Sequence, residues 1–366
     1  MTSSDERYMA LALTLGRRGQ GMTWPNPSVG CVIVREGRIV GRGWTQPGGQ
    51  PHAETEALTQ AGAAARGATA YVSLEPCAHQ GKTPPCAQAL IDAGVARVVA
   101  AVEDSDARVA GQGFAMLRAA NVTVDTGVLD QQAMRDHAGF FLRTEQGRPL
   151  VTLKLASSFD GRIATATGQS KWITGTQARR AVHAMRARHD AVMVGAGTAR
   201  ADDPSLTVRD LGVTQQPVRI VVSRHLDLPL MSQLARSAAE YPVWLCHAPG
   251  ADSERMLAWE GLGAKLIPCA VDGSQLDAGD LLQQLGSAGL TRVFCEGGSA
   301  LAASLLAEDL VDEFVGFGAG LAIGAEGLPA IGAMGLDRLE DAPRFTLSET
   351  RQIGADILHR WTRALK

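Results

Sequence analysis

The stretch Pro51-His52-Ala53-Glu54 is followed by Pro76-Cys77 and then by Cys86. One imidazole and two thiolates form a three-ligand set for Zn²⁺ that leaves the fourth tetrahedral position open. Zinc lowers the pKa of a water bound at such a position from about 16 toward 7. Glu54 is two residues from His52, so at the start of a helix it can share the pocket and carry a proton to a leaving amine. The stretch therefore predicts a site for hydrolytic deamination.

The spacing of the two cysteines departs from the known nucleobase deaminase pattern, H-x-E with P-C-x-x-C. Eight residues separate Cys77 from Cys86, where that pattern has two. Three of the eight favour a loop, so the second thiolate can return to the same site: Gly81, Pro84 and Pro85. The loop also carries polar groups suited to an anionic or hydroxyl-rich substrate: His79, Lys82 and Thr83.

A structural zinc site is the first alternative. Structural zinc normally takes four protein ligands, whereas only three are evident here, and His79 or a distant residue would have to be the fourth. A second alternative is a non-catalytic, zinc-stabilised protein with a nucleotide-binding tail. The catalytic interpretation differs from it in requiring Glu54.

A deaminase that acts on nucleic acid is a third alternative. It would need a basic groove and stacking aromatic side chains. The net charge is −3 and aromatic residues make up 5% of the chain, and the pI is about 6.3. Composition therefore argues against nucleic acid or an anionic membrane as the partner.

The length of 366 residues favours two domains. Gln146-Gly147-Arg148-Pro149 is a plausible boundary, which gives domains 1–147 and 148–366. The N-terminus begins polar and acidic and continues with helical spacing of apolar residues, unlike a signal peptide. No apolar run is long enough to span a membrane, and the six cysteines suit a reducing compartment, so a cytoplasmic protein is expected.

Strands and helices alternate along both halves, which predicts mostly parallel sheets with helices on their faces. In the first half we expect a hairpin, 29–34 with 38–41, then helices at 52–65, 86–92 and 113–120 and strands at 69–74, 96–102 and 122–128. In the second half we expect strands at 150–155, 191–194, 218–222, 243–246, 264–267, 292–295 and 314–317.

Two glycine-containing turns follow strands of the second half. Gly297-Gly298 precedes an apolar helix, and Gly195-Ala196-Gly197-Thr198 follows residues 191–194. Such turns expose backbone N–H groups that favour phosphate, although neither is a full G-x-G-x-x-G and each also suits simple close packing. Four nearby arginines suit a solvated helix face as well as a phosphate clamp: Arg179, Arg180, Arg186 and Arg188.

Taken together, these motifs resemble the bifunctional pyrimidine deaminase/uracil reductases of riboflavin biosynthesis over nearly the whole chain. The resemblance rests on Pro25-Asn26-Pro27-Ser28-Val29-Gly30, Pro51-His52-Ala53-Glu54, Leu74-Glu75-Pro76-Cys77-Ala78-His79, Thr83-Pro84-Pro85-Cys86, Lys154-Leu155-Ala156, Ser158-Phe159-Asp160-Gly161, Trp172-Ile173-Thr174, Ala201-Asp202-Asp203-Pro204 and Glu296-Gly297-Gly298. The resemblance implies an α/β fold with a cytidine-deaminase-like three-layer α/β/α N-terminal domain and a dihydrofolate-reductase-like α/β C-terminal domain.

The resemblance also implies two consecutive reactions. A zinc-dependent deaminase (residues 1–147) would act on 2,5-diamino-6-ribosylamino-4(3H)-pyrimidinone 5′-phosphate. An NADPH-dependent reductase (residues 148–366) would then convert the ribosyl group to ribityl, giving 5-amino-6-ribitylamino-uracil 5′-phosphate. The partners implied are small pyrimidine ribotides and further copies of the chain in a dimer or tetramer, with no nucleic acid and no membrane.

Family positions carry over to individual residues of this chain. Zinc would be held by His52, Cys77 and Cys86, with Glu54 as the proton shuttle. Cofactor positions fall on Ala156, Trp172, Thr198, Asp202, Ser223, Gly298, Ser299, Ala300, Leu301, Ala302, Ala303 and Ser304. Substrate positions fall on Asn26, His79, Lys82, Ser170, Arg186, Asp202, Leu206, Arg209 and Glu296. The proton donor of the reduction stays open among Asp202, Lys154 and water.

Two positions depart from the family pattern. Thr45 stands where the family has a histidine, and Gly320-Leu321 stands where it has Pro-Lys. The first affects a deaminase substrate contact and the second the reductase half. An active deaminase joined to a degenerate reductase is therefore the alternative function.

Overall fold

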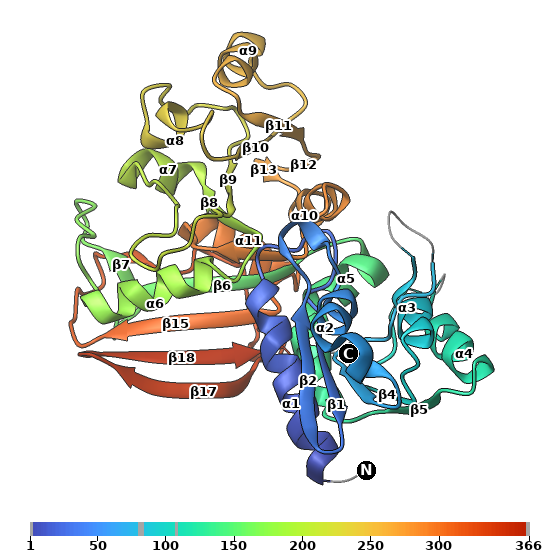
Figure 1. The fold of residues 1–366 in the computed structure, drawn as a ribbon. Helices are drawn as coiled ribbons and strands as arrows, with labels where there is room; N and C mark the ends of the chain where they lie inside the picture. Colours follow the sequence, from blue (N-terminus) through green and yellow to red (C-terminus); the bar gives the residue numbers. More distant parts are fainter. Residues whose placement is uncertain (1–2, 80–83, 107–108, 364–366) are drawn as a thin grey trace. The chain divides into compact units, whose positions relative to one another are not determined.

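A computed structural model describes residues 3–79, 84–106 and 109–363. The described chain forms two compact units, Met1–Gly147 and Arg148–Lys366. Each unit has its own sheet and its own apolar core (Figure 1).

Unit 1 is built on a five-stranded sheet of order β2-β1-β3-β4-β5. Its strands are β1 (Gly30–Arg35), β2 (Arg38–Trp44), β3 (Thr69–Val72), β4 (Arg97–Ala100) and β5 (Thr123–Thr126). β1 is antiparallel to both of its neighbours, whereas β3, β4 and β5 run parallel. The hairpin expected near residues 29–41 is thus present, with Glu36 and Gly37 at positive φ in its turn.

Helices cover both faces of this sheet. They are α1 (Ser3–Gly16), α2 (Ala53–Ala61), α3 (Cys86–Asp92), α4 (Gln112–Ala119) and α5 (Asp130–Gln146), with 3₁₀ turns at Arg17–Gly19, Pro47–Gly49 and Gly62–Ala65. A Cβ on Gly30 would collide with α1, whereas a Cβ on Gly43 would collide with α2. Because Gly30 pairs with Trp44, it points to the face opposite Gly43, so α1 and α2 lie on opposite faces. Unit 1 is a three-layer α/β/α sandwich.

Unit 2 contains a nine-stranded sheet of order β11-β10-β9-β8-β14-β6-β15-β18-β17. The strands are β6 (Leu150–Ser158), β8 (Ala191–Gly195), β9 (Val218–Val222), β10 (Val243–His247), β11 (Lys265–Pro268), β14 (Arg292–Cys295), β15 (Glu313–Ala319), β17 (Thr346–Ile353) and β18 (Asp356–Thr362). The first seven strands in this order are parallel, and the terminal hairpin of β17 and β18 is antiparallel. Two short ribbons pair β7 (Arg162–Ala164) with β16 (Leu328–Pro329) and β12 (Val271–Asp272) with β13 (Gln275–Leu276).

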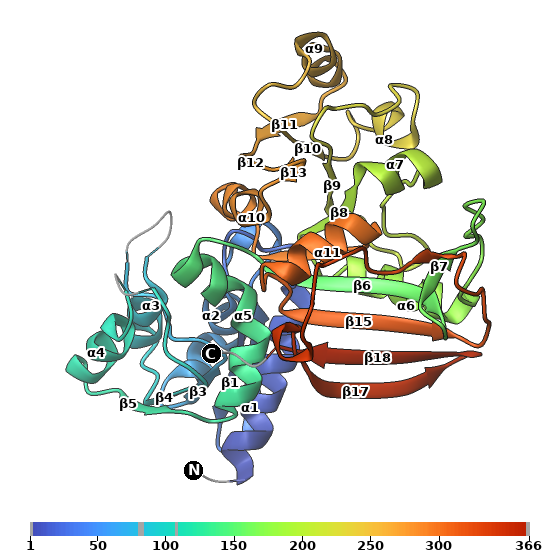
Figure 2. The same ribbon diagram turned by 180° about the vertical axis from the view of Figure 1, so that it is seen from behind.

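The helices of unit 2 connect the parallel strands, as a mostly parallel sheet requires. They are α6 (Thr176–Arg186), α7 (Ala196–Asp202), α8 (Gln233–Arg236), α9 (Ser253–Gly261), α10 (Ala278–Ser287) and α11 (Ser299–Ala307), with a 3₁₀ turn at Leu339–Asp341. Ala178 and Val182 of α6 pack against Phe317 of β15 and Leu358 of β18. Figure 2 shows the hairpin of β17 and β18 beside β15, at one end of the sheet.

Several of the observed elements differ from the expected ones. The helix expected over 52–65 begins at Ala53 and gives way at Gly62, where φ is 51°, to a 3₁₀ turn. The strand expected over 69–74 ends at Val72. The hairpin of β17 and β18 was not predicted, because charged residues interrupt its apolar pattern. Among the described residues, no helix combines the length and apolarity needed to cross a bilayer.

Candidate active sites

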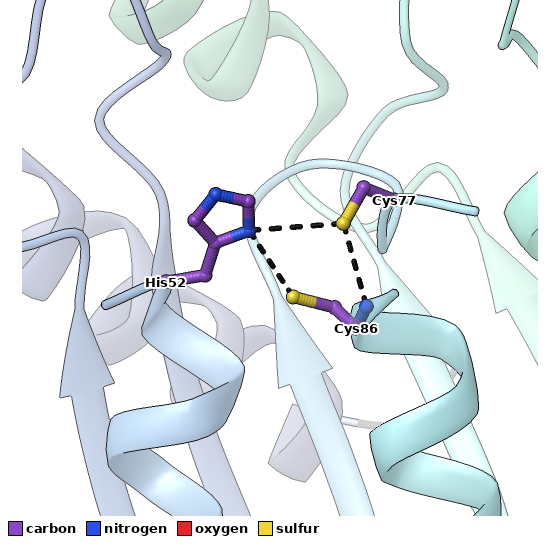
Figure 3. Close-up of side chains that lie close together, drawn as sticks. All are labelled: His52, Cys77 and Cys86. Carbon is purple, nitrogen blue, oxygen red and sulfur yellow. Dashed lines mark hydrogen bonds between the residues drawn. The ribbon is translucent and has the colours of Figure 1, made fainter. Parts of the chain in front are cut away.

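Three side chains of unit 1 gather as a metal site: His52, Cys77 and Cys86. The Nδ1 atom of His52 lies 3.2 Å from the Sγ atom of Cys86 and 3.7 Å from the Sγ atom of Cys77. Tetrahedral zinc with ordinary Zn–N and Zn–S bonds separates such atoms by about 3.5 Å. The donor set and its spacing therefore fit one Zn²⁺ with an open fourth position (Figure 3).

Close packing of α2 on β2 places the histidine. The ideal Cβ positions of Gly41 and Gly43 fall 2.1 Å from the carbonyl oxygens of Ala57 and Ala53, respectively, so only glycine lets the helix lie this near the strand. His52 is the N-cap of α2, with extended backbone (φ −72°, ψ 161°). The imidazole therefore projects from the first turn of a helix held rigidly to the sheet.

The two cysteines come from the segment between β3 and α3. Cys86 is the first residue of α3, and Cys77 lies in the coil before it. The backbone N–H of Cys86 donates to the Cys77 sulfur at 3.3 Å, and the N–H of Ala87 donates to the Cys77 carbonyl at 3.1 Å. The start of α3 thus holds both thiols in one place.

Interactions inside the cluster change the pKa values of the two thiols in opposite directions. Hydrogen bonding from Cys86, opposed by burial and aided by His52, lowers the pKa of the Cys77 thiol to about 4. Hydrogen bonding to the Cys77 thiolate raises the pKa of His52, and the same thiolate raises the pKa of Cys86. One of the two thiols is therefore readily ionised, and metal binding must release the proton of the other.

Glu54 lies on the first turn of α2, next to the cluster, and is 3% exposed. Burial, reinforced by the Cys77 thiolate, raises the pKa of Glu54 to about 7. A carboxyl group poised near neutrality can take up and release a proton at working pH. The geometry therefore suits Glu54 to proton transfer beside the metal position.

The other residues considered for the deaminase substrate differ in their surroundings. Asn26 donates from Nδ2 to the carbonyl of Gly49 at 3.3 Å. His79 is exposed at the start of the loop after Cys77, and Lys82 lies outside the described residues. Thr45 is buried, and its hydroxyl accepts from the N–H of Val29 at 3.0 Å. In this chain Thr45 supports the backbone rather than facing a ligand.

In unit 2, the two glycine turns meet at the carboxyl ends of neighbouring strands. β8 leads directly into α7 at Gly195, and β14 precedes α11, whose N-cap is Gly298. The N–H of Gly298 donates to the Thr198 hydroxyl at 3.2 Å, which joins the two turns. The N-cap residue, Gly298, has no side chain with which to cap the first turn of α11. This edge of the sheet, with a free helix N-terminus, suits a phosphate group.

The seven positions from Gly298 to Ser304 that were assigned to the cofactor differ in how buried they are. Ala302 and Ala303 are buried and pack inward, whereas Ser299, Ala300, Leu301 and Ser304 are exposed or half-buried. The accessible positions are therefore the first turn of α11 and Ser304, whereas Ala302 and Ala303 serve the core.

A buried ionic cluster lies beside this turn. Arg186 of α6 donates from Nε to Oε1 of Glu296, and Lys154 of β6 lies with Nζ 3.9 Å from Oε2 of the same carboxylate. Burial lowers the pKa of Lys154, with Glu296 opposing that change. Burial opposes ionisation of Glu296, but Arg186 and Lys154 outweigh it and lower its pKa. The solvated helix face considered for Arg186 is therefore wrong, because its side chain is 11% exposed.

The remaining predicted positions of unit 2 surround these features or stand apart from them. Asp202 ends α7 and contributes to the electrostatic environment of Lys154. Ser223 is buried and donates to Asp227 at 3.1 Å. Trp172 is 69% exposed, with the Arg179 guanidinium 4.5 Å from its ring centre. Leu206 is buried in the core, which leaves only its backbone for a ligand.

Three further positions are less constrained. Ala156 and Ser170 are half-buried, and Arg209 is exposed, with its backbone N–H donating to His183. Gly320-Leu321 begins a loop that is tied to Asp160, which accepts from the N–H groups of Ile323 and Gly324. The sequence analysis missed Glu75 as a functional candidate, although it lies two residues before Cys77 and is 5% exposed. Its position as an acidic residue close in sequence to the expected ligand Cys77 could have identified it.

Comparison with known families gives one match for each unit. Residues 2–102 match the cytidine and deoxycytidylate deaminase zinc-binding region. Residues 149–359 match the RibD C-terminal domain. The first match contains all three clustered ligands, and the second contains the glycine turns and the ionic cluster.

Relatives and solved structures span both units. The riboflavin biosynthesis protein RibD of Escherichia coli (strain K12) is 41% identical over 366 residues, covering 96% of this chain and 98% of the relative. A structure of Acinetobacter baumannii RibD superposes with a TM-score of 0.88 at 38% identity, covering 99% of each chain. A diaminohydroxyphosphoribosylaminopyrimidine deaminase/5-amino-6-(5-phosphoribosylamino)uracil reductase from Thermotoga maritima gives a TM-score of 0.86 at 32% identity, again covering 99% of each.

Proposed function

Because the chain belongs to the RibD family and is a bifunctional deaminase and reductase of riboflavin biosynthesis, we propose which residues perform each reaction and on what substrate. The zinc-binding region makes unit 1 the deaminase, and the RibD C-terminal domain makes unit 2 the reductase. The substrate of the first step is 2,5-diamino-6-ribosylamino-4(3H)-pyrimidinone 5′-phosphate. The product of the second step is 5-amino-6-ribitylamino-uracil 5′-phosphate.

In the deaminase, the observation that carries the proposal is the three-ligand cluster with a buried acid beside it. His52, Cys77 and Cys86 hold zinc, which when bound supplies a Lewis acid that activates water. Glu54 takes the proton from that water and delivers it to the departing amine. Burial raises its pKa, which favours holding the proton between the two transfers. Asn26, His79 and Lys82 position the substrate.

In the reductase, the free N-terminus of α11 holds the phosphates of a nicotinamide cofactor, which supplies a hydride. The family supports a nicotinamide cofactor, and NADPH is our specific proposal. Cofactor contacts come from the first turn of α11 and from Ala156, Trp172, Thr198, Asp202 and Ser223. Arg186, Leu206 through its backbone, Arg209, Ser170 and Glu296 position the substrate, with Asp202 able to meet both ligands.

The buried ionic cluster supports the proposal that unit 2 orients the ribosyl group. Arg186 and Lys154 both lie against one carboxylate, Glu296, so each charged group is fixed by the others. A fixed cluster holds a hydroxyl-rich sugar in one orientation, and orientation supplies much of the rate of a hydride transfer. Two charged donors lie in this cluster, and burial lowers the pKa of Lys154, which suits it to protonate the developing alkoxide.

The experiment supplies zinc-replete protein with the diaminopyrimidine ribotide and follows ammonia release and NADPH oxidation as separate signals. We expect ammonia first and NADPH oxidation second, at no more than one equivalent each. Ammonia without NADPH oxidation would support a degenerate reductase half, with Gly320-Leu321 as the first suspect. Silence in both signals would refute the substrate, and activity with NADH equal to that with NADPH would refute the cofactor specificity.

A further inference from the structure

Cys77 differs from the other two metal-site residues in how the fold holds it. His52 is the N-cap of α2 and Cys86 is the first residue of α3, so a helix positions each of them. Cys77 lies in coil, with the start of α3 supporting it on its downstream side. Its upstream support must come from Glu75 and Pro76, the residues that connect it to β3.

Glu75 is buried, and its carboxylate accepts four backbone N–H groups. Oε1 accepts from Gly113 at 2.8 Å and from Phe114 at 3.3 Å. Oε2 accepts from Gly111 at 2.9 Å and from Asp104 at 3.2 Å. A carboxylate is needed here because it offers acceptors on both oxygens, whereas a glutamine amide would turn a donor toward two of the four N–H groups.

This carboxylate also replaces the missing cap of a helix. The N-cap of α4 is Gly111, which has no side chain with which to cap it. Glu75 accepts from N–H groups in the first turn of α4, the group that a local cap would otherwise satisfy. The negative charge also lies at the positive end of the helix dipole. The segment that carries Cys77 is therefore tied to the N-terminus of α4.

The backbone around Glu75 makes the tie rigid. The N–H of Glu75 donates to the carbonyl of Val102 at 3.0 Å, which continues the pairing of β3 with β4. A Cβ on Gly113 would lie 1.9 Å from the Pro76 carbonyl oxygen, so the first turn of α4 packs directly on the peptide that precedes Cys77. Movement of α4 or of Glu75 would therefore move Cys77.

We propose that Glu75 is a positioning residue for the Cys77 thiolate, and that through this tie it sets the zinc affinity and the geometry of the deaminase site. The proposal rests on the metal site proposed above. Outer residues that orient a ligand typically change metal affinity or activity by about 10- to 100-fold when they are replaced. Glu75 would act at this level without contacting metal or substrate.

The test compares Glu75→Gln with the unsubstituted protein, using full-length chains. Zinc affinity is measured by competition with a chromophoric chelator, and the site geometry by the visible spectrum of the Co²⁺-substituted protein. We expect about a 10- to 100-fold loss of zinc affinity, a changed cobalt spectrum and a similar loss of deamination. NADPH oxidation by unit 2, supplied with the deaminated substrate, should stay unchanged.

Asp5→Asn is the matched control in the same unit. Asp5 is also a buried carboxylate, and it accepts from the Tyr71 hydroxyl and the Arg97 guanidinium, each at 2.9 Å. Its loss should lower the unfolding temperature and leave zinc affinity unchanged. A Glu75→Gln protein that is destabilised like Asp5→Asn, but keeps normal zinc affinity and a normal cobalt spectrum, would reduce Glu75 to a helix cap and overturn the proposal.

Glu75→Asp covers the case in which Glu75→Gln does not fold. Aspartate keeps the charge but is one methylene shorter, so we expect a smaller loss of zinc affinity with some spectral change. Unchanged affinity and an unchanged spectrum in Glu75→Asp would overturn the proposal. Failure of the unsubstituted chain to take up zinc or cobalt would instead refute the metal site itself, and the positioning role with it.

Discussion

The two candidate sites of this protein are assembled in different ways. The metal site of unit 1 draws its ligands from residues 52 to 86, with His52 and Cys86 at helix starts and Cys77 in the coil between β3 and α3. The ionic cluster of unit 2 draws on Lys154, Arg186 and Glu296, which lie on separate elements. The residues of the first site lie within one short part of the sequence, and their spacing indicates their chemistry. The residues of the second site lie far apart in the sequence and meet only once the parallel sheet has formed.

The variant expected to separate the two sites most clearly replaces Glu54, the proposed proton carrier of unit 1. Glu54→Gln should lower the rate of deamination by about 1000-fold or more, because the chain loses its general acid and base. Zinc content, measured by atomic absorption, should stay at one per chain, and reduction of the deaminated substrate should be unaffected.

Glu56→Gln is the matched control, since Glu56 lies on the same helix and is not in the metal cluster. It should behave like the parent protein. Normal deamination in Glu54→Gln would remove Glu54 from the role of proton carrier.

The raised pKa of Glu54 also makes a prediction about stability. The folded unit keeps this proton up to about pH 7, whereas the unfolded chain releases it near pH 4.5. Between those values the folded state binds more protons, so the stability of the metal-free unit falls as pH rises and then levels off.

Glutamine does not titrate, so metal-free Glu54→Gln should gain up to about 3 kcal/mol relative to the parent between pH 4.5 and 8. Denaturant unfolding of both proteins at pH 5 and pH 8 measures this. An equal stability difference at the two pH values would show that burial does not perturb this carboxyl group.

In unit 2, Glu296→Gln tests the distributed site. Arg186 and Lys154 would lose their shared carboxylate, and misplacement of such groups by about 1 Å can cost about 100-fold in rate. We expect a loss of that size in NADPH oxidation with the deaminated substrate, while deamination by unit 1 stays normal. Because Glu296 opposes the lowering of the Lys154 pKa, the alkaline limb of the pH–rate profile should also move to lower pH.

Glu313→Gln is the control for this variant. Glu313 accepts from Thr152 and pairs with Arg360 in the same unit, away from Glu296. Its replacement should cost stability without moving the pH profile. An unchanged profile in Glu296→Gln would remove Lys154 from the role of proton donor.

The contrast also explains how far sequence alone could go. The alternation of strands and helices predicted the α/β fold in both units, and the resemblance to known deaminase/reductases is confirmed by the relatives. His52, Cys77 and Cys86 could be named because ligand spacing is local and chemically specific.

Other features could not be predicted from the sequence pattern, because they depend on contacts between residues that are distant in the sequence. Arg186 on an amphipathic helix looks like a surface arginine until its partner Glu296 is placed beside it by the sheet. The hairpin of β17 and β18 was missed because Glu349 and Arg351 break its apolar alternation. The role of Glu75 depends on α4, whose N–H groups come from residues far along the chain.

The two outermost strands of the nine-stranded sheet have a consequence for the protein at high concentration. An outer strand offers unpaired N–H and C=O groups to any other extended chain and so invites aggregation. β11 carries Lys265 and Pro268, a charge and a residue without an N–H, and β17 carries Glu349 and Arg351 paired at 3.0 Å. Both edge strands therefore carry residues that disfavour pairing with another chain. Glu349 and Arg351, which made the last hairpin hard to predict, also oppose growth of the sheet into a fibre.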